Sequence, residues 1–464
     1  MSDTFQIITP VDGSVYAERP LISKTTAEAA VSTAHAAQAQ WHRVPLSERQ
    51  RILSAAVDYF NEEKAAIAEE LAWTIGRPIS QGVGEVGGFT ERAQYMIEAA
   101  PGALADINPG EKAGFERYIQ RVPVGVVFTI APWNFPYMTA VNTIWPALLS
   151  GNAVILKQAK QTAVCSDRIA RVLKKAGLPE GVFQAYDMSH ATAARVMQAE
   201  SVRLVCFTGS VKGGQAVQRA IADGGNFAGS SLELGGKDPA YVRSDADLNA
   251  AAAGLADGAL FNSGQSCCSI ERIYVDRSVY EKFLEKLCAE VKALNLGNPI
   301  APDTSLGPVV SKEAAAFVRS QIDDAVKMGA RTLIDVAEFP ADAPGTPYLA
   351  PQVLVDVNHG MRIMTEESFG PVVGVMPVDS DEQAIELMND SEFGLTASVW
   401  TKDSERARNI GEQLQTGTVY MNRCDYLDPA LAWVGVKNTG RGCSLSVVGF
   451  EQLTRAKSFH FKKI

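Results

Sequence analysis

Short apolar runs alternate with segments of helical periodicity along most of the chain, over residues 118–421. The run Val124–Ile130 is apolar almost throughout, which is typical of a strand buried on both faces of a parallel sheet. The next segment, Tyr137–Ser150, has the apolar spacing of a helix. Because such strands and helices alternate with short links, the pattern predicts two α/β domains with parallel sheets, joined near residues 232–240.

The same pattern predicts the other elements of both domains. The further predicted strands are Ala153–Leu156, Val182–Tyr186, Leu204–Thr208, Arg272–Val275, Val372–Pro377, Ala397–Trp400 and Thr418–Met421. The further predicted helices are Ser166–Ala176, Ala191–Glu200, Gly214–Ala222, Leu248–Leu260, Val279–Leu294, Asp381–Met388 and Glu405–Gln413. Residues 297–360 are less regular, and no element is predicted there.

The two ends of the chain show other patterns. Residues 1–25 predict a hairpin that turns at Asp12-Gly13. Ser47 and Gln50 have the spacing of a capping box, which predicts a helix from there to about Gly76. A second helix is predicted over Gly88–Ala100. Near the C-terminus, polar and apolar residues alternate over Ser458–Phe461, as in an edge strand, and an exposed edge favours pairing with another chain.

Composition and charge exclude several classes of partner. The chain has 464 residues, of which 46% are hydrophobic and 21% charged, as is usual for globular proteins. Its net charge of −10 disfavours a nucleic-acid partner, which would select for a basic face. No charge occurs in the 35 residues from Val122 to Leu156, but Pro132, Pro136 and Pro146 interrupt this run. The run therefore predicts buried strands and turns, and no membrane partner is expected.

Cysteine and histidine usage indicates the compartment and argues against a metal site. The seven cysteines are scattered, odd in number and contain no CxxC pair. In a long chain without an N-terminal signal pattern, this favours a reduced, cytoplasmic protein. The five histidines are isolated from one another and from the cysteines. No metal-binding residues are therefore predicted.

The stretch Leu232–Ser269 contains two groups capable of chemistry. It begins LELGGK, with Glu233, and ends with Cys267 and Cys268. An ionised thiol can be a nucleophile, and a carboxylate can activate water. The alternative is a surface acid and a small buried residue, because free cysteines are among the most buried residues. Residues 232–269 do not decide between these interpretations.

Two loops add candidate groups. In the loop Ile130–Pro136, Pro132 and Pro136 fix the backbone around Asn134, whose amide could serve an oxyanion site. A tight turn with packed aromatic residues is the alternative. A second loop, Phe207–Ser210, joins a strand to a glycine-rich turn and a helix, and such turns can hold phosphate at the helix N-terminus. It lacks the GxGxxG fingerprint, so this signal is weak.

Seven segments together resemble the aldehyde dehydrogenase superfamily over essentially the whole chain. In order, they are APWNFP (131–136), ILK (155–157), FTGS (207–210), LELGGK (232–237), GQSCCS (264–269), EESFGPV (366–372) and NDSEFGLTASVW (389–400). The resemblance implies a fold with two doubly wound α/β domains, a Rossmann-like cofactor domain and a catalytic domain, and a small β arm. It implies a cofactor domain of residues 1–105 and 126–235, a catalytic domain of 236–440, and a bridging and oligomerisation arm of 106–125 and 441–464.

The resemblance also implies a mechanism in which an aldehyde is oxidised to a carboxylic acid. Cys267 adds to the aldehyde as a thiolate, and Asn134 and the Cys267 backbone N–H hold the oxyanion. Hydride then passes to NAD(P), and Glu233 activates the water that hydrolyses the thioester. The alternatives are a CoA-acylating enzyme, a catalytically silent binding protein and a plain thioesterase-like hydrolase. The presence of Glu233 argues against the CoA-acylating alternative.

The resemblance assigns further residues to the cofactor. Lys157 would contact the adenine-side ribose, Ser210 the pyrophosphate and Glu367 the nicotinamide ribose. The remaining residues implied to line the cofactor site are Ile130, Trp133, Lys160, Gly209, Gly213, Leu234 and Phe369. Phe369 as a core residue and Lys157 as a surface residue are the alternatives. Gly235 and Gly236 are expected to allow close backbone approach near the nicotinamide.

The chain departs from the family pattern at several positions. Lys160 stands where many members have a glutamate that binds the ribose hydroxyls, so NADP is plausible although NAD is expected. Thr143 replaces a lysine that many members use in proton transfer, which places the deacylation rate in doubt. Arg423 and Asp425 either touch the substrate or pair with each other. Cys268 is interpreted as a pocket residue.

The resemblance implies a small-molecule aldehyde as the substrate and a homodimer or homotetramer as the assembly. The identity of the aldehyde is not predicted, because the loops that line the substrate tunnel cannot be positioned from the sequence.

Overall fold

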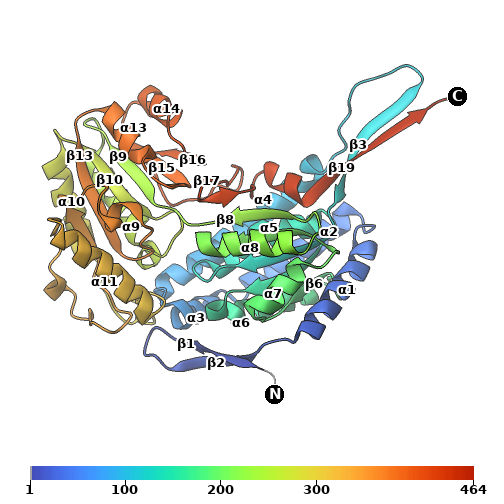
Figure 1. Cartoon of the computed structure of the whole chain (residues 1–464), viewed down its shortest axis with the longest axis horizontal. Helices are drawn as coiled ribbons and strands as arrows, with labels where there is room; N and C mark the ends of the chain where they lie inside the picture. Colours follow the sequence, from blue (N-terminus) through green and yellow to red (C-terminus); the bar gives the residue numbers. More distant parts are fainter. Residues whose placement is uncertain (1–2) are drawn as a thin grey trace.

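Two mainly parallel sheets organise residues 3–464, which are the residues that the computed structural model describes (Figure 1). In spatial order, the first sheet contains β18 (Gly440–Arg441), β8 (Gly229–Glu233), β7 (Val202–Thr208), β4 (Val126–Ala131), β5 (Ala153–Gln158) and β6 (Phe183–Ala185). The second sheet contains β11 (Arg331–Thr332), β12 (Gln352–Val355), β13 (Val372–Val378), β10 (Ile270–Asp276), β9 (Asp238–Val242), β15 (Thr396–Trp400) and β16 (Thr418–Met421). Each sheet with its helices forms one domain.

Helices cover both faces of the first sheet because its strands are apolar on both sides. In β4, Val126, Phe128 and Ile130 pack on one face, while Val127 and Ala131 pack on the other. The helices on the first face are α1 (Lys24–Trp41), α7 (His190–Met197) and α8 (Val211–Asp223). The helices on the second face are α2 (Leu46–Asn61), α3 (Lys64–Ile75), α4 (Ile79–Ala103), α5 (Pro136–Leu149) and α6 (Ala163–Lys175).

The second sheet is covered in the same way. The helices on one of its faces are α9 (Leu248–Leu260) and α10 (Tyr280–Lys292). Those on the other are α11 (Lys312–Lys327), α12 (Arg362–Thr365), α13 (Asp381–Asn389) and α14 (Ser404–Gly411). The predicted architecture of two doubly wound α/β domains is therefore confirmed. No helix within residues 3–464 combines the length and apolar character that a bilayer span requires.

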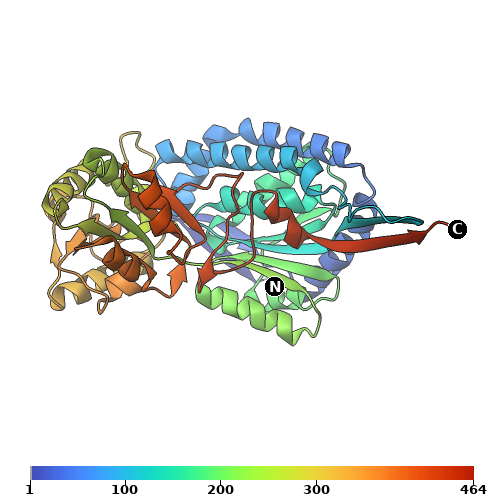
Figure 2. The same ribbon diagram turned by 90° about the horizontal axis from the view of Figure 1, so that it is seen from above.

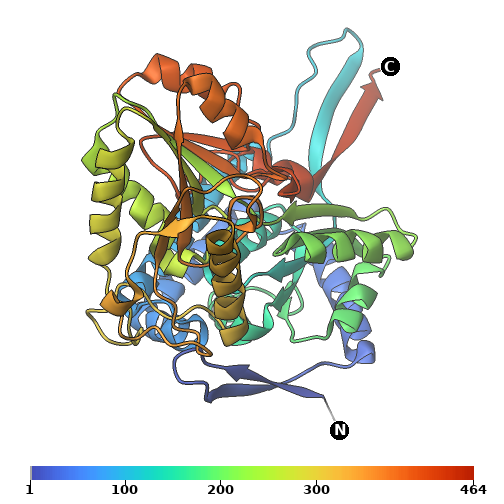
Figure 3. The same cartoon turned by 60° about the vertical axis from the view of Figure 1, so that its left-hand side comes forward.

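A two-stranded arm projects from the body of the molecule (Figures 1 and 2). It consists of β3 (Phe115–Pro123) and β19 (Thr454–Lys462), which are antiparallel over their full length. The N-terminal hairpin of β1 (Thr4–Ile8) and β2 (Val15–Pro20) lies on the opposite side of the first domain from the arm (Figure 3). The hairpin predicted at the N-terminus is confirmed, and the small β arm completes the predicted fold class.

Several predicted helix boundaries are wrong. Ser47 does not cap α2, because the helix begins at Leu46 after Pro45 and has no side-chain cap. Val44 and Leu46 pack on the core, and this packing fixes the start of the helix. The predicted helix from Ser47 to Gly76 consists of two helices, α2 and α3.

Two other helices also differ from the prediction. The helix predicted from Gly88 begins earlier, at Ile79. The sequence pattern did not predict α1, whose buried face consists mainly of alanines such as Ala27, Ala30 and Ala34. Alanine gives little contrast with polar neighbours, so the period of this helix is weak.

Candidate active site

The carboxyl ends of four parallel strands meet where the first sheet faces the second domain. β4 leads into the loop that contains Asn134, β5 ends beside Lys157, β7 ends at Thr208 and β8 ends at Glu233. From β4 the chain continues to β5 and β6 on one side of β4, and it then returns to β7 on the other side of β4. Ligands of open α/β sheets bind at such a switch point, outside the carboxyl ends of the strands.

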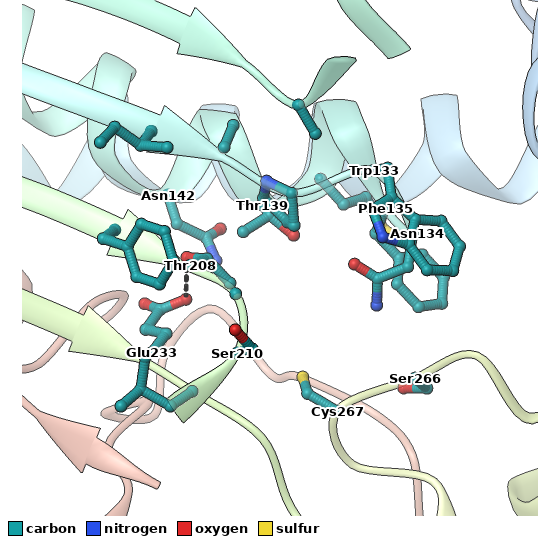
Figure 4. Close-up of a pocket in the computed structure, with 18 of the residues that line it drawn as sticks. Trp133, Asn134, Phe135, Thr139, Asn142, Thr208, Ser210, Glu233, Ser266 and Cys267 are labelled. Atoms are coloured by element: carbon teal, nitrogen blue, oxygen red, sulfur yellow. Dashed lines mark hydrogen bonds between the residues drawn. The ribbon is translucent and has the colours of Figure 1, made fainter. Parts of the chain in front are cut away.

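A cavity of about 910 Å³ lies at this position, between residues of both domains, and is called the central cavity below. Every residue that the sequence predicted for catalysis or cofactor binding lines it. These residues are Ile130, Trp133, Asn134, Lys157, Lys160, Gly209, Ser210, Gly213, Glu233, Leu234, Cys267, Glu367 and Phe369. Figure 4 shows Asn134, Ser210, Glu233 and Cys267 around this space.

Buried charges hold the loop that contains Asn134. Arg77 donates to the backbone carbonyl of Asn134 and forms an ion pair of 2.5 Å with Glu85, and both side chains are fully buried. The other Glu85 oxygen accepts from the backbone N–H groups of Tyr137 and Met138, at 2.9 Å each, in the first turn of α5. The loop is therefore fixed from two sides. Asn134 donates one amide hydrogen to the Gln265 carbonyl at 3.2 Å, and its second hydrogen is left for another acceptor.

A tight turn positions Cys267. The preceding residues Asn262, Ser263 and Gly264 all have positive φ, at 52°, 57° and 70°. The side chain of Ser263 donates to the Gly307 carbonyl at 2.8 Å, which stabilises this strained backbone. Cys267 is partly exposed to the central cavity.

The two ends of the stretch 232–269 touch each other directly. A Cβ on Gly236 would overlap the carbonyl oxygen of Cys267, and a Cβ on Gly235 would overlap the carboxylate of Glu367. Both positions therefore need glycine. The chain passes from β8 to β9 through this pair, so the crossing between domains lies against the loops of Cys267 and Glu367.

Two hydroxyl groups hold the Glu233 carboxylate. Ser444 donates to Oε1 at 2.5 Å and Thr208 donates to Oε2 at 3.2 Å. Burial raises the pKa of Glu233 above its ordinary value, and these two hydrogen bonds partly oppose this effect. In Figure 4, Glu233 turns toward Thr208 and away from Cys267, which leaves space between the acid and the thiol.

A buried ion pair supports the loop of Glu367 and Phe369. Lys237, the last residue of LELGGK, lies 2.5 Å from Glu271 and donates to Ser368 Oγ at 3.0 Å. Glu271 also accepts the backbone N–H groups of Ser368 and Phe369. These contacts hold Phe369 at a positive φ of 52° and in edge contact with Trp133, with 5.5 Å between ring centroids.

The Glu367 carboxyl group is nearly buried. Burial raises its pKa to about 7, and its Oε1 accepts the N–H of Gly236 at 3.0 Å. The group therefore changes charge near neutral pH, at the end of the central cavity closest to the Cys267 loop.

The other end of the cavity contains a helix N-terminus and two lysines. Ser210 caps α8 by accepting the Gly213 N–H at 3.1 Å, and a helix N-terminus of this kind attracts phosphate. Lys157 is half-buried at the end of β5, and burial lowers its pKa. The Lys160 ammonium lies 5.3 Å from the ring centroid of Phe5 in the N-terminal hairpin. These residues form a cationic edge that suits a phosphorylated ligand.

The two residues singled out in the C-terminal segment do not pair with each other. Asp425 lines the central cavity and accepts from Ser266 at 3.0 Å and from Cys268 at 2.9 Å. Burial raises its pKa to about 6. The Arg423 guanidinium instead stacks on the Tyr426 ring, 3.5 Å from its centroid.

Several groups around the site were not predicted. Ser444 and Thr208, rather than Thr143, contact Glu233, and Lys237 with Glu271 supports the opposite loop. One sequence signal was available: LELGGK ends in a lysine inside an apolar crossing between domains, where a charge needs a partner. Among residues 3–464, no group of three or more His, Cys, Asp or Glu side chains is placed to hold a metal ion.

Together, the fold and the cavity define a class of protein: two doubly wound domains that bring a thiol, an amide and a half-buried carboxylate to one cavity of about 910 Å³. Comparison with known families gives the same class. Residues 1–459 match the aldehyde dehydrogenase family, and the chain belongs to this family. It is an NAD(P)-dependent enzyme that oxidises aldehydes to carboxylic acids.

Individual relatives act on diverse aldehydes. The chain is 36% identical to a vanillin dehydrogenase of Corynebacterium glutamicum, over 94% of this chain and 89% of the relative. It is 32% identical to an NADP-dependent succinate-semialdehyde dehydrogenase of Mycobacterium tuberculosis, over 97% and 98%. The solved structure of an indole-3-acetaldehyde dehydrogenase with NAD+ covers 99% of the chain with a TM-score of 0.94 and 32% identity, and 93% of that structure is matched. Relatives therefore use either cofactor.

Proposed function

We propose that Cys267, Asn134 and Glu233 carry the two half-reactions of a hydrolytic aldehyde dehydrogenase. The observation that supports this proposal is that one cavity brings these three side chains together from both domains. The thiol is the nucleophile, the amide stabilises the oxyanion and the carboxylate is the general base.

In the first half-reaction, the Cys267 thiolate attacks the aldehyde carbon and forms a thiohemiacetal. The free amide hydrogen of Asn134 and the Cys267 backbone N–H stabilise the oxyanion. NAD(P) supplies the hydride acceptor when it is bound. Lys157, Ser210 and Glu367 hold the cofactor, with Ile130, Trp133, Gly209, Gly213, Leu234 and Phe369 along its length. A thioester on Cys267 remains.

In the second half-reaction, Glu233 removes a proton from the water that attacks the thioester carbon. Its two hydroxyl partners hold the carboxylate at the wall of the same cavity. The thiolate is the leaving group, and the acid product is released.

The experiment that tests this scheme compares Cys267→Ser with Glu233→Gln. Cys267→Ser is expected to form no NAD(P)H from any aldehyde while still binding the cofactor. Glu233→Gln is expected to release one equivalent of NAD(P)H in a burst and then to turn over very slowly. Full steady-state turnover by Glu233→Gln would contradict the role of the base. Product analysis with and without CoA separates hydrolysis from acyl transfer to CoA.

We also propose that the enzyme accepts both NAD and NADP, with Lys160 at the ribose edge of the cavity. A lysine there does not repel a 2′-phosphate, whereas a glutamate would. Steady-state rates with each cofactor test this proposal. A rate ratio above about one hundred in either direction would contradict dual use, since it corresponds to nearly 3 kcal/mol of discrimination.

The arm supports a homo-oligomer, either a dimer or a tetramer. An isolated two-stranded ribbon is marginally stable, and the outer edges of β3 and β19 have no strand partner within residues 3–464. Light scattering is expected to exceed the 49.8 kDa of one chain, and a monomer would contradict the proposal. We also propose a cytoplasmic location and three domains: a cofactor domain of residues 1–105 and 126–235, a catalytic domain of 236–440, and an arm of 106–125 and 441–464. Within the last segment, Phe450 and Leu453 pack in the core of the first domain.

A further inference from the structure

The wall of the central cavity contains a buried cation with no carboxylate partner. Arg92 of α4 is 8% exposed and lines the cavity. Its Nη1 donates to the Met138 carbonyl at 2.7 Å and lies 3.5 Å from Asn142 Oδ1. Among residues 3–464, no carboxylate oxygen lies within 4.0 Å of its guanidinium. Buried charges in proteins are normally paired, so this position is energetically costly without a ligand.

The acids near Arg92 are already engaged by other groups. Glu85 pairs with Arg77 and accepts two N–H groups of α5. Asp425 accepts from a hydroxyl and a thiol, and Glu91 accepts from the Tyr426 hydroxyl at 2.9 Å. Burial lowers the pKa of Arg92, and its charge is felt by Glu233 and Asp425 across the cavity.

The shape of α4 directs the guanidinium into the cavity. Gly84, Gly88 and Arg92 are spaced four residues apart and therefore share one face of the helix, and all three line the cavity. A Cβ on Gly84 would meet nothing within 4 Å, and one on Gly88 would overlap the Met138 sulfur. Glu85 and Glu91 of α4 also line the cavity, but both have partners of their own, so Arg92 is the cation that this helix presents to the space. Its partner Asn142 lies beside Thr208 and Glu233 in Figure 4, so the cation belongs to the catalytic end.

We propose that Arg92 binds an anionic group of the substrate, a carboxylate or a sulfonate at the end of the aldehyde that does not react. The guanidinium has two planar edges of donors, of which only Nη1 is engaged by the protein. A carboxylate of the substrate would therefore neutralise Arg92 with charge-assisted hydrogen bonds. This assignment rests on the proposed function of the same cavity.

The test compares two matched pairs of aldehydes, one anionic and one neutral in each pair. The pairs are succinate semialdehyde with 4-methylpentanal, and 4-carboxybenzaldehyde with 4-isopropylbenzaldehyde. The wild type is expected to have the higher kcat/KM for the anionic member of at least one pair. Arg92→Gln is expected to lower this preference by about ten- to a hundredfold, through KM, with Arg92→Lys intermediate. The control Arg51→Gln removes an exposed arginine of α2 and is expected to leave kcat/KM unchanged for all four aldehydes.

A second measurement does not depend on catalysis. Succinate is the acid product of succinate semialdehyde. In calorimetry, it is expected to bind the wild type and Arg51→Gln but not Arg92→Gln. The melting temperature of Arg92→Gln shows whether this variant is folded. Equal losses for anionic and neutral aldehydes, or no loss, would overturn the assignment and indicate that Arg92 acts only on Cys267 and Glu233. Failure of the wild type to oxidise any aldehyde would instead overturn the proposed function, and the assignment with it.

Discussion

The hydroxyl of Ser444 is expected to control the pH at which the thioester is hydrolysed. Ser444→Ala removes the shorter of the two hydrogen bonds to Glu233, that of 2.5 Å, and leaves only the Thr208 contact of 3.2 Å. Both bonds stabilise the ionised carboxylate and oppose the effect of burial, which raises the pKa of Glu233. Loss of the Ser444 bond therefore raises this pKa further.

The magnitude follows from the strength of a hydrogen bond to a charged group, about 1.5–3 kcal/mol. At a pH below the pKa of Glu233, the ionised fraction then falls by about ten- to a hundredfold. Only the ionised carboxylate accepts the proton of water, so the hydrolysis rate falls by the same factor. The deficit disappears as the pH rises through the new pKa, and formation of the thioester is unaffected.

The assay is stopped-flow formation of NAD(P)H between pH 6 and 9. Ser444→Ala is expected to retain the initial burst and to show a slower steady state whose pH profile is displaced to higher pH. Thr208→Val should displace the profile in the same direction. Ser166→Ala removes a buried hydroxyl of α6 that donates to a backbone carbonyl at 2.7 Å, and this control should match the wild type. An unchanged profile, or a burst slowed as much as the steady state, would refute the reasoning.

Three further substitutions test the frame of the site. Glu85→Gln leaves Arg77 buried without its partner, so we expect a loss of about 3–5 kcal/mol in the free energy of unfolding, measured with urea. Gly236→Ala forces a Cβ against the Cys267 carbonyl oxygen, so the burst should disappear although the protein folds by circular dichroism. The pKa of Glu367 is about 7, so its carboxyl group ionises as the pH increases through 7 and the affinity for the cofactor should rise, by at most about tenfold per pH unit. In Glu367→Gln, the affinity measured by fluorescence titration should not change with pH over this range.

The roles of Asn134, Glu233 and Cys267 were predicted from motifs that resemble a known family, and the strands explain why two of these residues meet at one edge of the first sheet. Asn134 lies in the loop after β4, Glu233 is the last residue of β8 and Thr208 is the last residue of β7, and parallel strands bring their carboxyl ends to one edge. Strands buried on both faces give a strong apolar signal. The same signal is weak in α1, where alanines make the buried face, and that helix was missed.

The residues that adjust the charge and hydrogen bonding of the site, Ser444 and Arg92, could not be predicted, because only the tertiary fold brings them to the cavity. Ser444 contacts Glu233 across 211 positions of sequence, and it follows β18, which pairs with β8 so that Gly440 lies opposite Glu233. No local period marks such a residue. Arg92 left a partial signal, since Gly84, Gly88 and Arg92 repeat every four residues on a helix whose other faces are apolar or exposed. The repeat shows that they share a face but not which surface that face meets.

The site is divided between two domains, and this division explains why both close-packed glycines and buried ion pairs surround it. The thiol comes from the second domain and the base from the first, and Gly235 and Gly236 make the crossing close enough for both to reach one carbonyl carbon. So close a crossing leaves no room for large apolar side chains. The frame is instead held by short charged contacts, Arg77 with Glu85 on the amide side and Lys237 with Glu271 on the other. Within residues 3–464, Arg92 has no such carboxylate partner, and this contrast with the two paired cations is why we assign its partner to the substrate.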